Sequence, residues 1–183
     1  MRRLALATLL ALCGAAAADP PAAVVPFLRG DEDGVLAVTG AFGPAKDTTI
    51  VVTYDMHGAG SYRGFALVPD AGAPHGYGKV PLPALPSGAE LGSSKDGAMR
   101  AALTANIDGR RGDELVLELA TVCCAGAQGA WMGVTYVVLA WRGGVFVRAS
   151  DLESKLETAL VAKDGSHATP LTDAELRAAL KLK

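Results

Sequence analysis

The stretch that decides the fold runs from Ala101 to Arg148 and reads AALTANIDGRRGDELVLELATVCCAGAQGAWMGVTYVVLAWRGGVFVR. Apolar and polar side chains alternate over 101–107 and again over 114–119, which is the pattern of strands with one buried face. From 134 to 141 both faces are apolar, as in a strand at the centre of a sheet or sandwich. An Arg-Gly-Gly turn then leads into Val-Phe-Val at 145–147, so we expect an antiparallel meander.

Toward the N-terminus, three shorter strands are predicted at 35–39, 48–54 and 64–68, and the second of them is rich in β-branched residues. The strand pattern then breaks down. The run from Val80 to Pro86 is rich in proline, which lacks the N–H that a sheet ladder needs. We therefore expect an extended connection across the domain here, with Leu82 and Leu85 resting on apolar surface.

Beyond residue 148 the apolar period changes from that of a strand to that of a helix. Ser150 with Glu153, and Thr172 with Glu175, match the capping box that begins a helix. Leucines at 152, 156 and 160 fall on one helical face. Two short helices, at about 151–162 and 173–181, are predicted to pack against the sheet.

The chain contains an internal similarity. Thr39-Gly-Ala-Phe42 matches Thr104-Ala-Asn-Ile107, and at the same spacing Ile50-Val-Val52 falls on Leu115-Val-Leu117. A glycine-containing turn and a further apolar strand follow in both places. One supersecondary unit used twice explains the match, because such units bury their apolar faces against copies of themselves.

These patterns predict a single β-rich domain over 34–183, with two related units at about 34–72 and 99–148. The expected fold class is mainly β (α+β): an antiparallel sheet or sandwich, or partial propeller-like units, with two short C-terminal helices. The 22 glycines and 10 prolines agree with frequent turns. A net charge of −2 provides no electrostatic footprint for nucleic acid, and there is no polybasic run for anionic lipid.

The first residues resemble an export signal. Arg2 and Arg3 precede a short apolar run, and Ala16-Ala17-Ala18 supply a small-residue cleavage site, so residues 1–18 are predicted to be a signal peptide. The run is shorter than the roughly 20 residues of a membrane span, and we expect a secreted or periplasmic product without a transmembrane segment. The alternative is a lipoprotein anchored through Cys13, against which the bulky Leu12 argues. Residues 19–33 are predicted to form a flexible arm.

Two cysteines lie beyond the predicted cleavage site, and they are neighbours: Cys123 and Cys124. Adjacent Cα atoms are about 3.8 Å apart, whereas disulfides usually span about 4.4–6.8 Å. A bond between them would form a strained ring that pins a turn. We expect this vicinal disulfide, and the alternatives are two buried free thiols or an intermolecular bridge.

The loop Asn106-Ile-Asp-Gly-Arg-Arg-Gly-Asp-Glu114, followed by an apolar strand, resembles the acidic loop of FG-GAP or VCBS-type repeats. The resemblance covers about 45 residues, and the vicinal cysteines and aromatic strand after it are similar to those of secreted bacterial proteins that carry this loop. It implies β-propeller-like units and a calcium site with Asp or Asn at alternate positions.

This copy of the loop departs from the calcium pattern. Calcium needs several converging oxygens, yet Arg110 stands where another acid is expected, and arginine carries a permanent positive charge. We therefore predict a loop that has kept the turn and lost the metal, in which Arg110 pairs with Asp108 or Glu114. A complete propeller also needs several blades, and this chain offers at most two units. No cofactor is predicted.

Few residues have the character of a catalytic site. Asp55 and His57 flank Met56 in one loop, and Ser61 follows, but no nucleophile-elbow motif surrounds that serine. Exposed loop histidines are the simpler interpretation of His57, and of the histidines at 75 and 167. Trp131, beside glycines, is a candidate exposed binding residue together with His57, whereas Tyr136 and one tryptophan are expected in the core.

The sequence therefore favours a secreted or periplasmic, non-catalytic domain with a binding or structural role, with an envelope or extracellular protein as a candidate partner. One alternative is a thiol–disulfide redox sensor that uses Cys123 and Cys124. Another is a hydrolase with a site at His57 and Asp55. The ligand, the oligomeric state and the redox state of the cysteines do not follow from the sequence.

Overall fold

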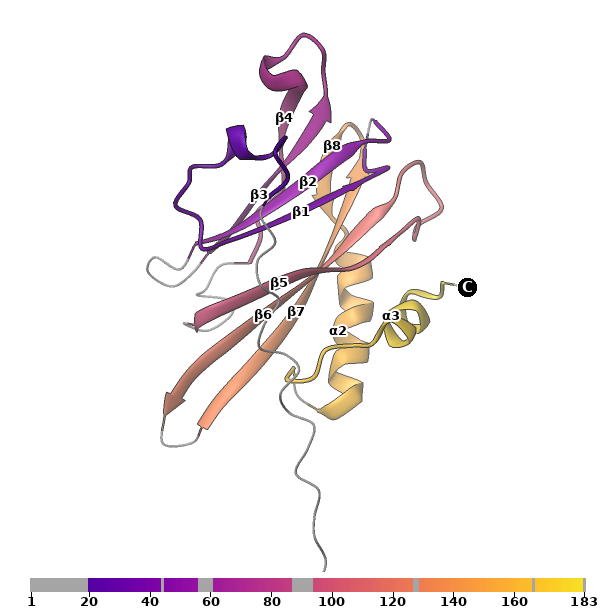
Figure 1. Cartoon of the computed structure of the whole chain (residues 1–183). Coiled ribbons are helices and arrows are strands. Elements are labelled where there is room, and N and C mark those ends of the chain that lie inside the picture. The colour runs from indigo at the N-terminus through magenta and orange to yellow at the C-terminus, as the bar shows by residue number, and fades with distance from the viewer. Residues whose placement is uncertain are drawn as a thin grey trace, which may run out of the picture.

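Figure 1 shows the computed structural model, which describes residues 20–43, 45–55, 61–86, 94–126, 129–165 and 167–182; the side chains of 94–98 and 120–132 lie outside this description. Two four-stranded antiparallel sheets account for about half of the described residues. Each sheet is a meander, with its strands paired in chain order. The expected antiparallel, mainly β architecture is therefore confirmed, and neither sheet closes into a barrel.

The first sheet contains β1 (Gly34–Gly40), β2 (Thr48–Asp55), β3 (Ser61–Pro69) and β4 (Tyr77–Pro81). Its ladder pairs Ile50 with Val38 on one side and with Ala66 on the other. Strand β4 was not predicted, and its last two residues, Val80 and Pro81, begin the run where an extended connection was expected. It is tolerated because it pairs only with β3, so that Pro81 occupies an edge strand, where a missing N–H costs little.

The second sheet contains β5 (Ser94–Ala105), β6 (Glu114–Gly126), β7 (Gly129–Arg142) and β8 (Val145–Arg148). The predicted meander over 101–148 is confirmed. Glycines at 143 and 144 both have positive φ in the tight β7–β8 turn, as hairpins of this length require. The two sheets span residues 34–81 and 94–148, each somewhat longer than the predicted units at 34–72 and 99–148. A common origin for the two units remains a prediction from the sequence.

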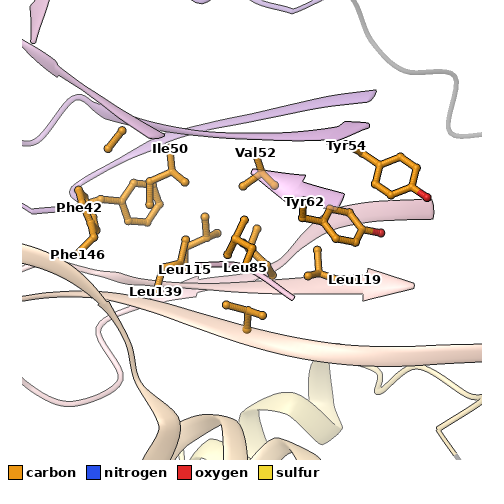
Figure 2. Close-up of a cluster of buried hydrophobic side chains, with 13 residues drawn as sticks. Phe42, Ile50, Val52, Tyr54, Tyr62, Leu85, Leu115, Leu119, Leu139 and Phe146 are labelled. Atoms are coloured by element: carbon orange, nitrogen blue, oxygen red, sulfur yellow. The ribbon is translucent and has the colours of Figure 1, made fainter. Parts of the chain in front are cut away.

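A buried hydrophobic cluster lies between the two sheets. Figure 2 shows side chains from the first sheet, such as Ile50 and Val52, opposite Leu115, Leu119 and Leu139 of the second. Leu85 belongs to this cluster and Leu82 packs against it, as expected for the proline-rich run. The sheets therefore form a sandwich with an apolar interior.

Helices α2 (Ser150–Asp164) and α3 (Asp173–Leu180) cover the opposite face of the second sheet. The buried leucines of α2 sit at 152, 156 and 160, the spacing that the sequence predicted. Gly165 ends α2 in the left-handed conformation that favours glycine. None of the helices in the described residues combines the length and apolar character needed to cross a membrane.

The two predicted capping boxes have different outcomes. Thr172 and Glu175 form a complete capping box at α3. At α2 the N-cap is Ala149 and no side chain caps the helix, so that prediction is wrong. Glu153 instead accepts hydrogen bonds from the Arg148 guanidinium, at 2.8 Å from Nη2, and from the Val138 N–H at 3.1 Å. Both donors lie beside the first turn of α2, Arg148 at the end of β8 and Val138 in β7.

Residues 20–33, for which a flexible arm was predicted, pack on the outer face of the first sheet. They include a short 3₁₀ helix, Val25–Phe27. Val24 is only 1% exposed, and it forms a cluster with Val51, Phe65 and Leu67. The segment packs there because this face of the sheet presents apolar side chains, among them Val51, Phe65 and Leu67.

The described chain thus has four layers: the N-terminal segment, the first sheet, the second sheet and the helices. A polar network joins the last two layers. Glu118, which is 5% exposed, accepts two hydrogen bonds from the Arg100 guanidinium at 2.8 and 2.7 Å and one from the Tyr136 hydroxyl at 3.0 Å. The Tyr136 oxygen in turn accepts from the Leu171 N–H at 2.8 Å, which ties the segment before α3 to the sheet.

We expect Arg100→Met to lower the free energy of unfolding by about 1–3 kcal/mol, because it removes two charge-assisted hydrogen bonds from a buried carboxylate. Glu118→Gln keeps an acceptor for Tyr136 and removes the buried charge. A double-mutant cycle by chemical denaturation should give a coupling energy of about 1 kcal/mol or more.

Arg177→Met is the matched control, because Arg177 belongs to an exposed i,i+4 ion pair with Asp173 and should cost no more than about 0.5 kcal/mol. Additive effects of Arg100→Met and Glu118→Gln would show that the network contributes no pairwise energy.

Candidate functional site

The acidic loop between β5 and β6 is closed by its own polar groups. The Asn106 amide donates to the carbonyl oxygens of Arg110 and Gly112, the second at 2.8 Å. Glu114 accepts from the Ile107 N–H at 2.6 Å, and Asp108 accepts from the Arg110 N–H at 2.9 Å. The acidic and amide side chains of this loop therefore hold its backbone in place.

Two arginines neutralise Asp108. The predicted contact with Arg110 is present, at 3.6 Å from Nε to Oδ2. Arg142, at the end of β7, is closer, at 3.1 Å from Nη2 to the same oxygen. Arg142 also lies 3.6 Å from Asp151 at the start of α2, so this guanidinium links the loop, the sheet and the helix.

Asp108 and Glu114 hydrogen-bond to each other, and their pKa values move apart. Burial raises the pKa of Glu114, and the negative charge of Asp108 adds to that rise. Burial also opposes ionisation of Asp108, but the Arg110 N–H and the charge of Arg142 outweigh it and lower the pKa of Asp108. The Asp108 carboxyl group therefore gives up its proton more readily than the Glu114 carboxyl group.

This geometry is that of a loop braced by guanidinium groups. Within the described residues, no three His, Cys, Asp or Glu side chains are arranged to hold a metal ion. Loss of the calcium site remains a prediction from the sequence, and calcium titration would test it.

A second candidate site is a cavity on the outer face of the first sheet, with a volume of about 230 Å³. The N-terminal segment covers only part of this face, and the cavity lies along its margin. Phe65 of β3 and Phe27 of the segment form an aromatic pair there, with ring centroids 6.4 Å apart. The residues that line the cavity are Phe27, Arg29, Asp31, Glu32, Thr53, Asp55, Arg63, Gly64, Phe65 and Lys79.

Strand alternation places these side chains together. Thr53 pairs with Arg63 across β2 and β3, so both point to the outer face, as does Phe65 two residues further on. The intervening Val52, Tyr54 and Tyr62 point into the sandwich core. On this outer face, a polar end around Thr53 and Arg63 therefore adjoins an apolar end around Val51 and Leu67. The N-terminal segment covers the apolar end.

The charged side chains that line the cavity differ in the contacts that they make. Burial would raise the pKa of Glu32, but the backbone N–H groups of Arg29 and Gly30, at 2.7 and 2.9 Å, outweigh it and lower that pKa. The Lys79 ammonium lies 4.0 Å from the centre of the Phe65 ring, a cation–π contact. In the described part of the chain, no ion pair neutralises Arg63, Lys79 or Asp31.

The structure places only some of the residues that the sequence analysis singled out. His57 lies outside the described residues, as does the side chain of Trp131, whose backbone belongs to β7. Asp55 lines the cavity at the end of β2. Tyr136 is buried as expected, and Trp141 packs against the core with its ring edge toward Phe146.

The sulfur atoms of Cys123 and Cys124 also lie outside the description, so the vicinal disulfide stays a prediction. The backbone of both residues belongs to β6, and the β6–β7 ladder is irregular between Cys123 and Gly126.

Sequence reasoning missed Phe27, Arg63, Phe65 and Lys79 as site residues. Arg63 and Phe65 alternate with inward-facing residues, and this pattern identifies the face on which they lie. The pattern does not reveal that the N-terminal segment returns over that face, so no local sequence pattern predicts the cavity.

Comparisons with known protein families, with curated protein sequences and with solved structures find no match to this chain.

We expect Glu114→Gln to raise the free energy of unfolding at pH 7–8, because the glutamine keeps an acceptor for Ile107 without a buried charge. A raised folded-state pKa means that the stabilisation from Glu114 is complete below the unfolded-state value of about 4.3 and is lost as the pH rises through the folded-state value. The variant should therefore lose less stability than the wild type as the pH increases, measured by urea denaturation across pH 4–8.

Asp108→Asn is the matched comparison and should act in the opposite direction. The lowered pKa of Asp108 makes its contribution complete above about pH 4 and lost as the pH falls. At pH 7 the asparagine should cost about 1–3 kcal/mol, because Arg142 loses its charged partner. Equal losses for both variants at pH 7 would contradict this assignment of the proton.

Proposed function

We propose that this protein is a non-catalytic binding domain that acts outside the cytosol and takes a small ligand into the cavity on the outer face of its first sheet. The export pattern in residues 1–18 supports the location, whether secreted or periplasmic. The cavity supports the binding role. An envelope or extracellular partner would then meet the same exposed face.

The observation that carries this proposal is the aromatic pair Phe27 and Phe65 beside Arg63 and Lys79, two cations that have no ion-pair partner in the described residues. Binding sites combine an apolar surface, which supplies affinity, with a few polar groups that fix orientation. Arg63 and Lys79 are two such groups, from adjacent strands. A cavity of about 230 Å³ is smaller than the roughly 300–1,000 Å³ of a drug-sized site, so the ligand should be small.

The composition of the lining favours binding over covalent catalysis. A nucleophile needs a base within hydrogen-bond reach. Thr53 is the single hydroxyl among the described lining residues, and no hydrogen bond connects its side chain to an acid or base. The hydrolase alternative requires His57 in addition, which lies outside the described residues.

A fragment screen by amide chemical-shift mapping tests the proposed function. Small charged aromatic fragments should shift the amides of cavity residues, among them Arg63 and Lys79. Arg63→Gln should weaken binding of anionic fragments at least tenfold, the effect of losing a charge-assisted hydrogen bond worth about 1.5–3 kcal/mol.

Lys155→Gln, on the exposed side of α2, is the control and should leave the fragment affinity unchanged. Shifts that map to another surface, or a screen without hits, would refute the proposed site.

The redox sensor is the second candidate. The irregular ladder between Cys123 and Gly126 supports it, because a bond between adjacent cysteines requires the backbone to depart from regular strand geometry. Mass measurement with and without reductant, each followed by alkylation, should show two alkylated cysteines only after reduction. Two cysteines alkylated in the denatured, unreduced protein would exclude the intramolecular bond.

A further inference from the structure

The lining of the cavity carries three positive and three negative side chains, and two of the cations stand on other strands than the acids. Arg63 and Lys79 stand on β3 and β4. Asp55 ends β2, while Asp31 and Glu32 lie in the segment that leads into β1. Because the strands are paired in the order β1 to β4, the acids gather on the β1–β2 side and these two cations on the β3–β4 side.

The path of the N-terminal segment maintains this separation. At one end Phe27 contacts Phe65, and its ring also lies 5.7 Å from the ring of His75. At the other end the Asp33 N–H donates to the Tyr54 carbonyl oxygen at 3.0 Å. The segment therefore crosses the sheet obliquely, from the β3–β4 side to the end of β2, and carries Asp31 and Glu32 to that end (Figure 1). Arg29 lies between these anchors.

The floor between the two charged sides is aromatic. Phe65 of β3 lies beneath the Lys79 ammonium, and Phe27 flanks it. A ligand with an apolar group can therefore rest on the rings while its charged groups reach opposite sides. A simple anion would match the cations and meet three carboxylates, and a simple cation would have the converse difficulty.

We propose, building on the binding function above, that the ligand is a small zwitterion of the α-amino-acid type with an apolar side chain. Its carboxylate lies toward Arg63 and Lys79, its ammonium toward Asp31, and its side chain against Phe27 and Phe65. A ligand of this size agrees with a cavity of about 230 Å³. The charges of ligand and lining both sum to zero, so that neither leaves an excess of one sign.

Three related compounds separate the parts of this recognition: phenylalanine, 3-phenylpropionate, which lacks the ammonium, and phenethylamine, which lacks the carboxylate. Isothermal titration of the purified protein should give phenylalanine an affinity at least tenfold higher than that of either analogue. Leucine tests whether the apolar group must be aromatic, and glycine tests whether it is needed.

Two variants assign the charged ends. Arg63→Gln should weaken phenylalanine and 3-phenylpropionate by a similar factor and leave phenethylamine unchanged. Asp31→Asn should weaken phenylalanine and phenethylamine and leave 3-phenylpropionate unchanged. Both residues are exposed, so the variants should keep the wild-type melting temperature, and Lys155→Gln serves as the control for a surface charge distant from the cavity.

The outcomes distinguish this inference from the binding function on which it rests. Equal affinity for phenylalanine and one analogue would overturn the zwitterion while leaving a binding site for that analogue. If none of the compounds binds but other fragments shift the cavity amides, the ligand class is wrong and the site is right. If no compound of any class shifts those amides, both are wrong.

Discussion

Strand β6 depends on burial of both of its faces, and the rest of the fold is arranged to provide it. Leu115, Leu117 and Leu119 point into the sandwich and are fully buried. Val116 and Glu118 point to the helical side and are also buried. Transfer of apolar surface from water is the main favourable contribution to folding. A sheet with two apolar faces therefore needs a cover on each, and the first sheet and the helices α2 and α3 supply them.

The buried and half-buried carboxylates around this strand each have a partner. Glu118 meets Arg100 and Tyr136, and Glu153 meets Arg148. Glu114 accepts a hydrogen bond from the Ile107 N–H and is hydrogen-bonded to Asp108. A buried carboxylate without such partners would be costly. These acids therefore fix which parts of the chain meet at the ends and the helical face of the second sheet.

The first sheet is covered less completely than the second. Two helices pack on the outer face of the second sheet, whereas the segment 20–33 is the part of the described chain that packs on that of the first. This segment covers the apolar end, around Val51 and Leu67. The polar end remains open beside it, and the proposed ligand site lies at this boundary. The N-terminal segment packs on part of this face, and the cavity forms where its cover ends.

The sequence by itself determined the elements whose signals are local. The alternation over 101–119, the apolar strand at 134–141, the Thr172–Glu175 capping box and the end of α2 at Gly165 all depend on neighbouring residues, and all are present. The pairing of Asp108 with Arg110 was also local. These features were predictable because short-range sterics and hydrogen bonding decide them.

Only the tertiary structure decided how distant segments meet. Arg142 approaches Asp108 from the end of another strand, and Glu153 turns from its expected cap to Arg148. Phe27 reaches Phe65, and β4 joins an edge where its proline is harmless. No short sequence motif predicts any of these contacts. They arise because two sheets, each apolar on both faces, must stack and be covered, and that requirement belongs to the whole chain.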